Sequence, residues 1–146
     1  MVDKNSVKPS VVFWILGVLF IIWALIGCSF YLLEVMMSDA DYAEAFGPEL
    51  AAVRDLHPTW AIAAYATAVW SGLIAAVLFV LRRRLCVPIF ILSLVAAIIG
   101  FIPSFTNSTL RDAAGSSFWV MPLIVVSLGI FEIIYSRKQR ANGILR

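Results

Sequence analysis

Four long apolar stretches constrain what this chain can fold into. They cover residues 11–33, 60–81, 87–105 and 118–135. Each is about as long as the helix of roughly 20 residues that crosses the hydrocarbon core of a bilayer. Because lipid offers the backbone no hydrogen-bond partner, spanning segments of this kind are expected to be helical. The sequence therefore predicts an all-α membrane protein, a bundle of four transmembrane helices in one domain over residues 1–146.

The composition and the segment boundaries agree with lipid as the main solvent. Charged residues make up 14% of the chain, whereas a soluble domain carries about 25%. Pro9, Pro58 and Pro88 lie at or just before the starts of the first three stretches, where a helix tolerates proline. The first stretch is longer than the roughly 7–15 apolar residues of a signal peptide, so we expect a retained helix.

The charged residues are segregated along the chain. Lysine and arginine in short loops mark the cytoplasmic side of a membrane protein. The predicted cytoplasmic side holds nine of the 11 basic residues: Lys4, Lys8, Arg82, Arg83, Arg84, Arg137, Lys138, Arg140 and Arg146. The opposite side holds seven of the nine acids: Glu34, Asp39, Asp41, Glu44, Glu49, Asp55 and Asp112. This pattern predicts that both termini are cytoplasmic and that residues 34–59 form an outer loop.

The outer loop contains a signal for a short surface helix. Gly47-Pro48-Glu49 resembles a helix start, with proline at the first helical position and an acid in the first turn. Leu50, Val53 and Leu56 then fall on one helical face. We expect the acidic residues of this loop to form a solvated face, with a cation site outside the cytoplasm as the alternative.

Rows of small residues predict how the helices pack. Small side chains let helix backbones approach closely in lipid. The rows repeat every four residues: Ala64, Ala68, Gly72 and Ala76; Ala63, Thr67, Ser71 and Ala75; and, in the third stretch, Ala96, Gly100 and Ser104. We therefore expect the second helix to be central and the third helix to pack on it.

Aromatic and hydroxyl side chains near mid-membrane form a candidate solute pocket. Counting from the span ends places five such residues at this depth: Trp23, Thr67, Trp70, Ser71 and Ser127. If they converge, they would line a weakly polar aromatic pocket suited to a sugar ring or another small amphipathic solute. The alternative is that the two tryptophans fill space or face lipid.

Glu132 is the only ionisable residue within a predicted span. A charge inside the membrane is costly, which makes this residue a candidate for function. It lies close to the predicted inner boundary, at the depth of Arg82, Arg83 and Arg84. We expect an ion pair with these arginines that pins the fourth helix to the second; the alternative is a proton- or cation-coupling carboxylate.

Several kinds of chemistry have no support in the residue types. Cys28 and Cys86 fall on opposite leaflets and are not expected to bridge, and His57 is the only histidine. We therefore expect no metal site and no cofactor. No nucleophile is paired with a base, so we do not expect an enzyme. The basic clusters are explained by topology and anionic lipid headgroups rather than by nucleic acid.

Short sequence blocks carry a resemblance to a known family. They are Trp23 and Gly27, Met37-Ser38-Asp39, Tyr42 to Phe46, Pro58-Thr59-Trp60-Ala61, residues 68–73, Leu81 to Arg84, Pro88, residues 92–94 and the basic segment from Tyr135 to Arg146. The chain resembles a family of small bacterial four-span membrane proteins of unknown function, some of them labelled "sugar transporter". The family pattern has Trp-Asn where this chain has Trp23-Ala24, so a polar site that uses the asparagine would be altered here. The resemblance implies a bacterial inner membrane location and no known enzyme activity.

Two functions follow from these observations. The first is a small multi-pass inner-membrane protein with a structural or interaction role in the lipid bilayer. The alternative is a small-solute transporter, with sugar as one substrate class, or a transport accessory subunit. Four spans are few for a solitary transporter, so that alternative requires a homo-oligomer. Small multidrug exporters rely on a carboxylate deep in the first helix, and residues 11–33 contain none.

Overall fold

Four long helices dominate the computed structural model, which describes residues 7–146 and thus leaves the predicted cytoplasmic residue Lys4 outside. They are α1 (Val11–Met36), α4 (Thr59–Val80), α5 (Cys86–Thr106) and α7 (Val120–Ala141). Each is long and apolar enough to cross a membrane, with 26, 22, 21 and 22 residues respectively. At a rise of about 1.5 Å per residue, even the shortest matches a hydrocarbon core of about 30 Å. The predicted all-α fold with four membrane-spanning helices is confirmed.

Hydropathy located the spans better than it located their ends. The first helix continues past the predicted end at Leu33 to Met36, and the last continues past Tyr135 to Ala141. The end of the last helix is set by Gly143, whose φ of 74° ends the helical path. The backbone N–H groups of Gly143 and Ile144 donate to the carbonyls of the last turn, which is a Schellman motif.

The connection between α1 and α4 contains α2 (Asp39–Phe46), α3 (Pro48–Val53) and the 3₁₀ turn η1 (Arg54–Leu56). The predicted surface helix is confirmed as α3, with Pro48 in its first turn. Helix α2 was not predicted from the sequence. The signal for it is Ser38, whose side-chain oxygen caps the helix by accepting from the Asp41 N–H at 3.2 Å.

The connection between α5 and α7 is also helical, although no helix was predicted there. It contains α6 (Ser108–Ala114) and the 3₁₀ turn η2 (Gly115–Ser117). The Asn107 side chain caps α6 by accepting from the Thr109 N–H at 3.0 Å. These short helices give the chain a structured layer beyond the ends of its spans.

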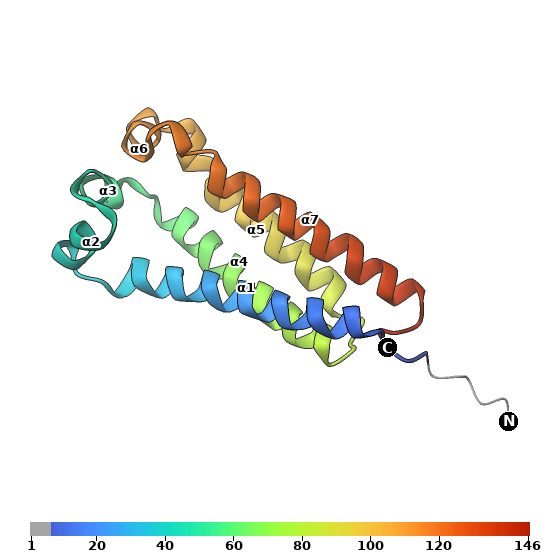
Figure 1. Cartoon of the computed structure of the whole chain (residues 1–146). Helices are drawn as coiled ribbons and strands as arrows, with labels where there is room; N and C mark the ends of the chain where they lie inside the picture. Colours follow the sequence, from blue (N-terminus) through green and yellow to red (C-terminus); the bar gives the residue numbers. More distant parts are fainter. Residues whose placement is uncertain (1–6) are drawn as a thin grey trace, which may run out of the picture.

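The two ends of the bundle differ in charge. One end carries both described ends of the chain and the turn between α4 and α5, while α2, α3 and α6 lie at the other (Figure 1). We call the first the basic end, defined by Lys8, Arg82–Arg84 and Arg137–Arg146. We call the second the acidic end, defined by residues 34–57 and 107–117.

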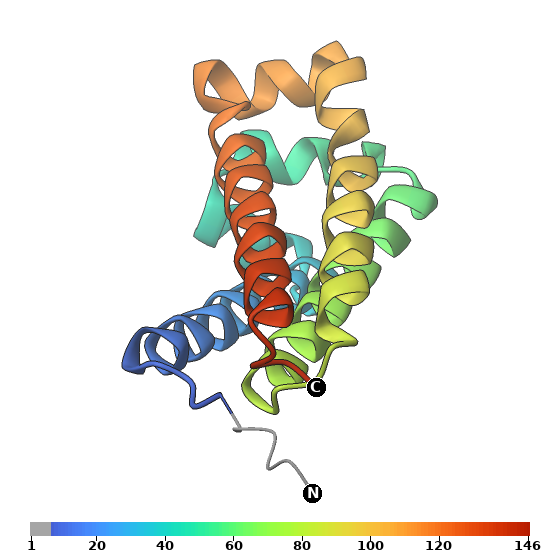
Figure 2. The same ribbon diagram turned by 90° about the vertical axis from the view of Figure 1, so that its right-hand side faces the viewer.

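The second span is central, as predicted. Helix α4 packs against both α1 and α5, and α7 packs on α5 (Figures 1 and 2). Helices α1 and α7 approach each other near the basic end, where the Phe20 ring lies edge-on to the rings of Phe131 and Tyr135. The arrangement is therefore a chain of neighbours, α1–α4–α5–α7, that closes through aromatic rings.

Small residues and carbonyl-directed hydrogen bonds hold α4 to its neighbours. A Cβ on Gly72 would lie 3.0 Å from the Ser93 Oγ, and one on Gly100 would lie 3.5 Å from the Tyr65 backbone nitrogen. The Ser93 Oγ donates to the Ala68 carbonyl of α4 at 2.7 Å. Close backbone approach and interhelical hydrogen bonds of this kind drive association where the lipid removes the hydrophobic contribution.

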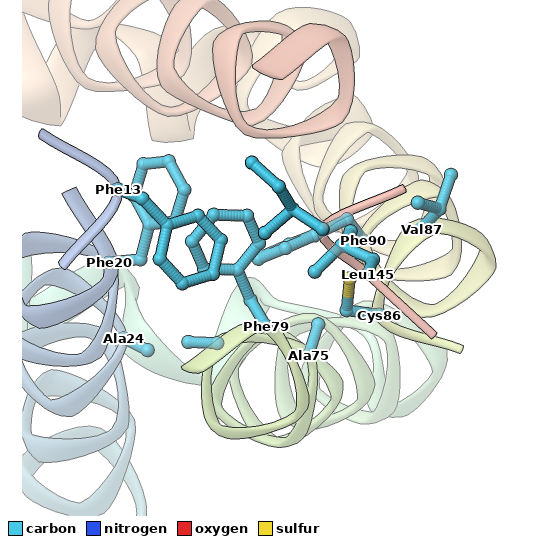
Figure 3. Packing of buried hydrophobic residues seen from close by; sticks show 11 residues of the cluster. Phe13, Phe20, Ala24, Ala75, Phe79, Cys86, Val87, Phe90 and Leu145 are labelled. Carbon is cyan, nitrogen blue, oxygen red and sulfur yellow. The ribbon is translucent and has the colours of Figure 1, made fainter. Parts of the chain in front are cut away.

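The hydrophobic core sits toward the basic end. Phe13 and Phe79 stack with their ring centroids 4.5 Å apart, and Phe20 and Phe90 lie beside them (Figure 3). Leu145, from the segment after α7, is fully buried in the same cluster. The core therefore joins all four spans to the segment that follows the last one.

Candidate functional site

The five predicted pocket residues do not converge. On α4, Thr67 and Trp70 lie on an exposed stripe with Ile74, and Trp70 is 43% exposed. Ser71 faces the interior instead, and its Oγ donates to the Thr67 carbonyl at 2.5 Å. Neighbouring residues of a helix point about 100° apart, so a shared depth does not give a shared face. This corrects the predicted grouping of Trp70 with Ser71.

The other two predicted pocket residues lie on helices that flank the central pair. Trp23 is partly buried on α1, which packs on α4. Ser127 is exposed on α7, which packs on α5. The prediction of one mid-membrane pocket is therefore not supported by the placement of its residues.

Glu132 lies on the face of α7 that packs toward α5. Gly129, one turn earlier on this face, is close enough to α5 that a Cβ would lie 2.9 Å from a Leu94 methyl group. The Glu132 side chain is half-buried. Among the described residues, only Arg54 forms ion pairs with carboxylates. The predicted ion pair of Glu132 with the arginine cluster is absent from the structure.

The arginine cluster holds the segment after α7. Arg82 donates through Nε to the Ile144 carbonyl at 3.0 Å, and Arg84 donates through Nε to the Leu145 carbonyl at 3.3 Å. The backbone adds two bonds: the Arg146 N–H donates to the Arg82 carbonyl at 2.6 Å, and the Arg84 N–H donates to the Arg146 carbonyl at 3.0 Å. Arg82 and Arg84 therefore bind backbone carbonyls instead of Glu132. Because α7 continues to Ala141, Glu132 also lies deeper in the last span than the predicted end at Tyr135 implied.

Arg82 also links the two described ends of the chain. Its guanidinium donates to the Val7 carbonyl at 3.2 Å, before the start of α1. Its backbone has a φ of 60°, in the left-handed region that non-glycine residues seldom adopt. Arg83 and Arg84 remain exposed. The predicted cluster therefore divides into structural clamps, Arg82 and Arg84, and a solvent-facing Arg83.

A single arginine organises the acidic end. The Arg54 guanidinium donates to the carbonyls of Glu34 and Met37 at the end of α1, the latter at 3.0 Å. It also pairs with the carboxylates of Asp39 at 3.1 Å and Glu34 at 3.7 Å. The guanidinium carbon lies 4.7 Å from the centre of the Tyr42 ring. This network was not predicted from the sequence, where the acids were expected to form a solvated face. The signal for it is a lone arginine within an acidic segment.

Tyr42 lies beside both the Glu34 carboxylate and the Arg54 guanidinium. The pKa of the Tyr42 phenol is raised to about 12, mainly by burial and in second place by a hydrogen bond with Glu34. The rings of Tyr31 on α1 and Tyr65 on α4 meet edge-on, with their centroids 5.5 Å apart. The acidic end is thus an ordered layer built from charge and aromatic contacts.

No group of three or more histidine, cysteine, aspartate or glutamate side chains in residues 7–146 is placed to hold a metal ion. Cys28 and Cys86 are both free and buried. The Cys28 Sγ donates to the Val69 carbonyl at 3.5 Å and so belongs to the α1–α4 contact. The cysteines therefore serve helix packing.

Comparisons of the chain with models of protein families, with curated proteins and with solved structures find no match. The resemblance to small bacterial four-span proteins therefore stays a prediction. The function has to be argued from the geometry and charge of the described residues.

Proposed function

We propose that this chain is a structural or interaction protein of the bacterial inner membrane, with both termini in the cytoplasm. The segregation of charge between the basic end and the acidic end supports this orientation, because lysine and arginine stay on the cytoplasmic side. The family resemblance supports the bacterial inner membrane. The role we infer is association with other membrane helices rather than catalysis.

One observation carries the inferred role. Within residues 7–146, every buried side-chain nitrogen and oxygen has a hydrogen-bond partner. The hydroxyls of Ser71 and Ser93, both on packed helix faces, donate to backbone carbonyls of α4. A polar solute crossing the bundle would need free polar groups to replace its water. In residues 7–146, no fully buried side-chain nitrogen or oxygen is left free to bind such a solute. This favours a packing role.

The exposed stripe of α4 is the surface that we expect to associate. It belongs to α4, one of the two inner helices of the bundle, and carries Thr67, Trp70 and Ile74. Trp is enriched at interfaces because its ring is large and its N–H finds an acceptor there. A second copy of this chain is the partner that we infer for this stripe.

Disulfide trapping in native membranes tests the association. Ile74→Cys is expected to give a covalent dimer on mild oxidation, because the same stripe of two copies would meet. Leu123→Cys, on the exposed face of α7, is the matched control and is expected to stay monomeric. Equal dimer yields from the two positions, or none from either, would contradict the proposal.

A small-solute transporter remains the second candidate, and Glu132 is the observation that favours it. Its half-buried carboxylate within a span has no ion-pair partner among the described residues, and such residues mark ion and substrate pathways. A thermal-shift screen against sugars should show a shift that Glu132→Gln abolishes if this candidate holds. The absence of any shift would remove it.

A further inference from the structure

A groove runs between the end of α1 and the side of α2. It has a volume of about 680 Å³ and is open to the surroundings. One wall comes from the last turns of α1 and is apolar, and the other comes from α2 and carries two carboxylates. The residues that line the groove include Leu32, Leu33, Met36, Met37, Asp41 and Glu44.

The groove lies where the apolar end of a span meets the polar surface layer. Its apolar wall ends a helix that is otherwise membrane-spanning, and Met36 is 77% exposed there. Its acidic wall belongs to the surface layer of the acidic end. A molecule that fits both walls must have an apolar body and a polar head.

The charge of the groove is negative and is not neutralised within the fold. Arg54 is committed to Glu34 and Asp39. The Asp41 carboxylate accepts from the Ser38 hydroxyl at 2.6 Å, and Glu44 forms no ion pair among the described residues.

We propose that this groove binds an amphipathic organic cation, with its charge against Asp41 and Glu44 and its apolar body along Leu32, Leu33 and Met36. The other side of α2 shows the same chemistry within the fold, because the Arg54 cation lies there over the Tyr42 ring and between carboxylates. The carboxylates disfavour an anionic lipid headgroup. The apolar wall disfavours a hydrated inorganic cation.

Binding of hexyltrimethylammonium, which has a cationic head and an apolar tail, tests the acidic wall. The wild-type protein in phosphatidylcholine nanodiscs is expected to bind it saturably in equilibrium dialysis, after subtraction of uptake by empty nanodiscs. Glu44→Gln should weaken binding by about threefold to fivefold, the size of an exposed charge pair. Glu49→Gln removes the same charge from the exposed first turn of α3, outside the groove, and should leave binding unchanged. Equal weakening by both variants would overturn the proposal, because only the general charge of the acidic end would then matter.

The apolar wall is tested separately. Met36→Ala should weaken binding by about twofold to fivefold through lost apolar contact, whereas Val35→Ala, next to it but outside the groove, should not. Hexanesulfonate, which has the same six-carbon tail but an anionic head, is expected to bind far more weakly than the cation. Equal binding of the two probes, or no saturable binding of the cation, would refute the inferred site.

Discussion

At the scale of single residues, two arginines decide the local structure of the two ends. Arg54 neutralises the end of α1 and the start of α2, and Arg82 ties the turn between α4 and α5 to residues 7 and 144. Arg54 donates to carbonyls at the end of α1, where the last carbonyls of a helix lack partners in the helix. Arg82 donates to carbonyls of the non-helical segments before α1 and after α7. The fork of an arginine suits such multiple acceptors better than the point charge of lysine does.

Replacing Arg54 with alanine should loosen the acidic end. The change leaves Glu34 and Asp39 without their ion-pair partner, and we expect a loss of about 2 kcal/mol in the free energy of unfolding. Titration with sodium dodecyl sulfate measures it, and hydrogen exchange should localise the effect to residues 34–57. Arg111→Ala is the control at the same end, because Arg111 makes one long bond of 3.5 Å to the Phe105 carbonyl. A loss as large in Arg111→Ala would show that charge alone, and not the Arg54 network, stabilises this end.

Tyr42 should make stability depend on alkaline pH. Its pKa is raised to about 12 in the folded protein, from about 10 in the unfolded chain. The folded state therefore holds the phenolic proton more tightly, and this contribution is full below pH 10 and is lost as the pH rises from 10 toward 12. Between pH 9 and pH 11, the midpoint temperature of thermal unfolding should fall less steeply for Tyr42→Phe than for the wild type. Identical slopes would contradict the assigned environment of Tyr42.

At the scale of elements, the segment after α7 behaves as part of the core. Gly143 turns the chain, Ile144 and Leu145 are buried, and two arginines hold their carbonyls. The segment covers the basic end of the aromatic cluster, where Cys86 is also fully buried (Figure 3). A stretch that looks like a polar tail in the sequence is therefore a packing element.

Truncating the Leu145 side chain should open this end. Leu145→Ala is expected to lower the free energy of unfolding by about 2 kcal/mol or more, as for buried leucines elsewhere. The Cys86 thiol should then react faster with N-ethylmaleimide, which peptide-resolved mass spectrometry can follow apart from Cys28. Leu123→Ala, on the exposed face of α7, should change neither quantity. An unchanged Cys86 rate in Leu145→Ala would mean that the segment does not cover the core.

At the scale of the whole molecule, residues 7–146 form a bundle of four spans with a layer of short helices at the acidic end and none at the basic end. The acidic end has three short helices, whereas the basic end has a tight turn and a clamped segment (Figure 1). This asymmetry places the amphipathic groove and the Arg54 network on one side of the membrane. The arginine-rich surface lies on the other.

Topology reporters test the orientation of this unit. Green fluorescent protein fused after Arg146 should fluoresce, since it folds in the cytoplasm, and alkaline phosphatase fused after Ser116 should be active outside it. The charge segregation between the ends is the physical reason. An active phosphatase after Arg146 together with an inactive one after Ser116 would reverse the proposed orientation.

The sequence by itself determined the four spans, the surface helix at Pro48 and the central place of α4. Each of these follows from a local pattern: apolar runs as long as a bilayer is thick, the Gly47-Pro48-Glu49 helix start, and small residues repeated every fourth position. The tertiary structure alone decided that Trp70 faces outward while Ser71 faces inward, that Arg82 and Arg84 hold residues 144 and 145 instead of Glu132, and that Arg54 joins Glu34 to Asp39. These outcomes depend on the rotation of each helix about its axis and on contacts between residues far apart in the chain, which hydropathy and depth do not encode.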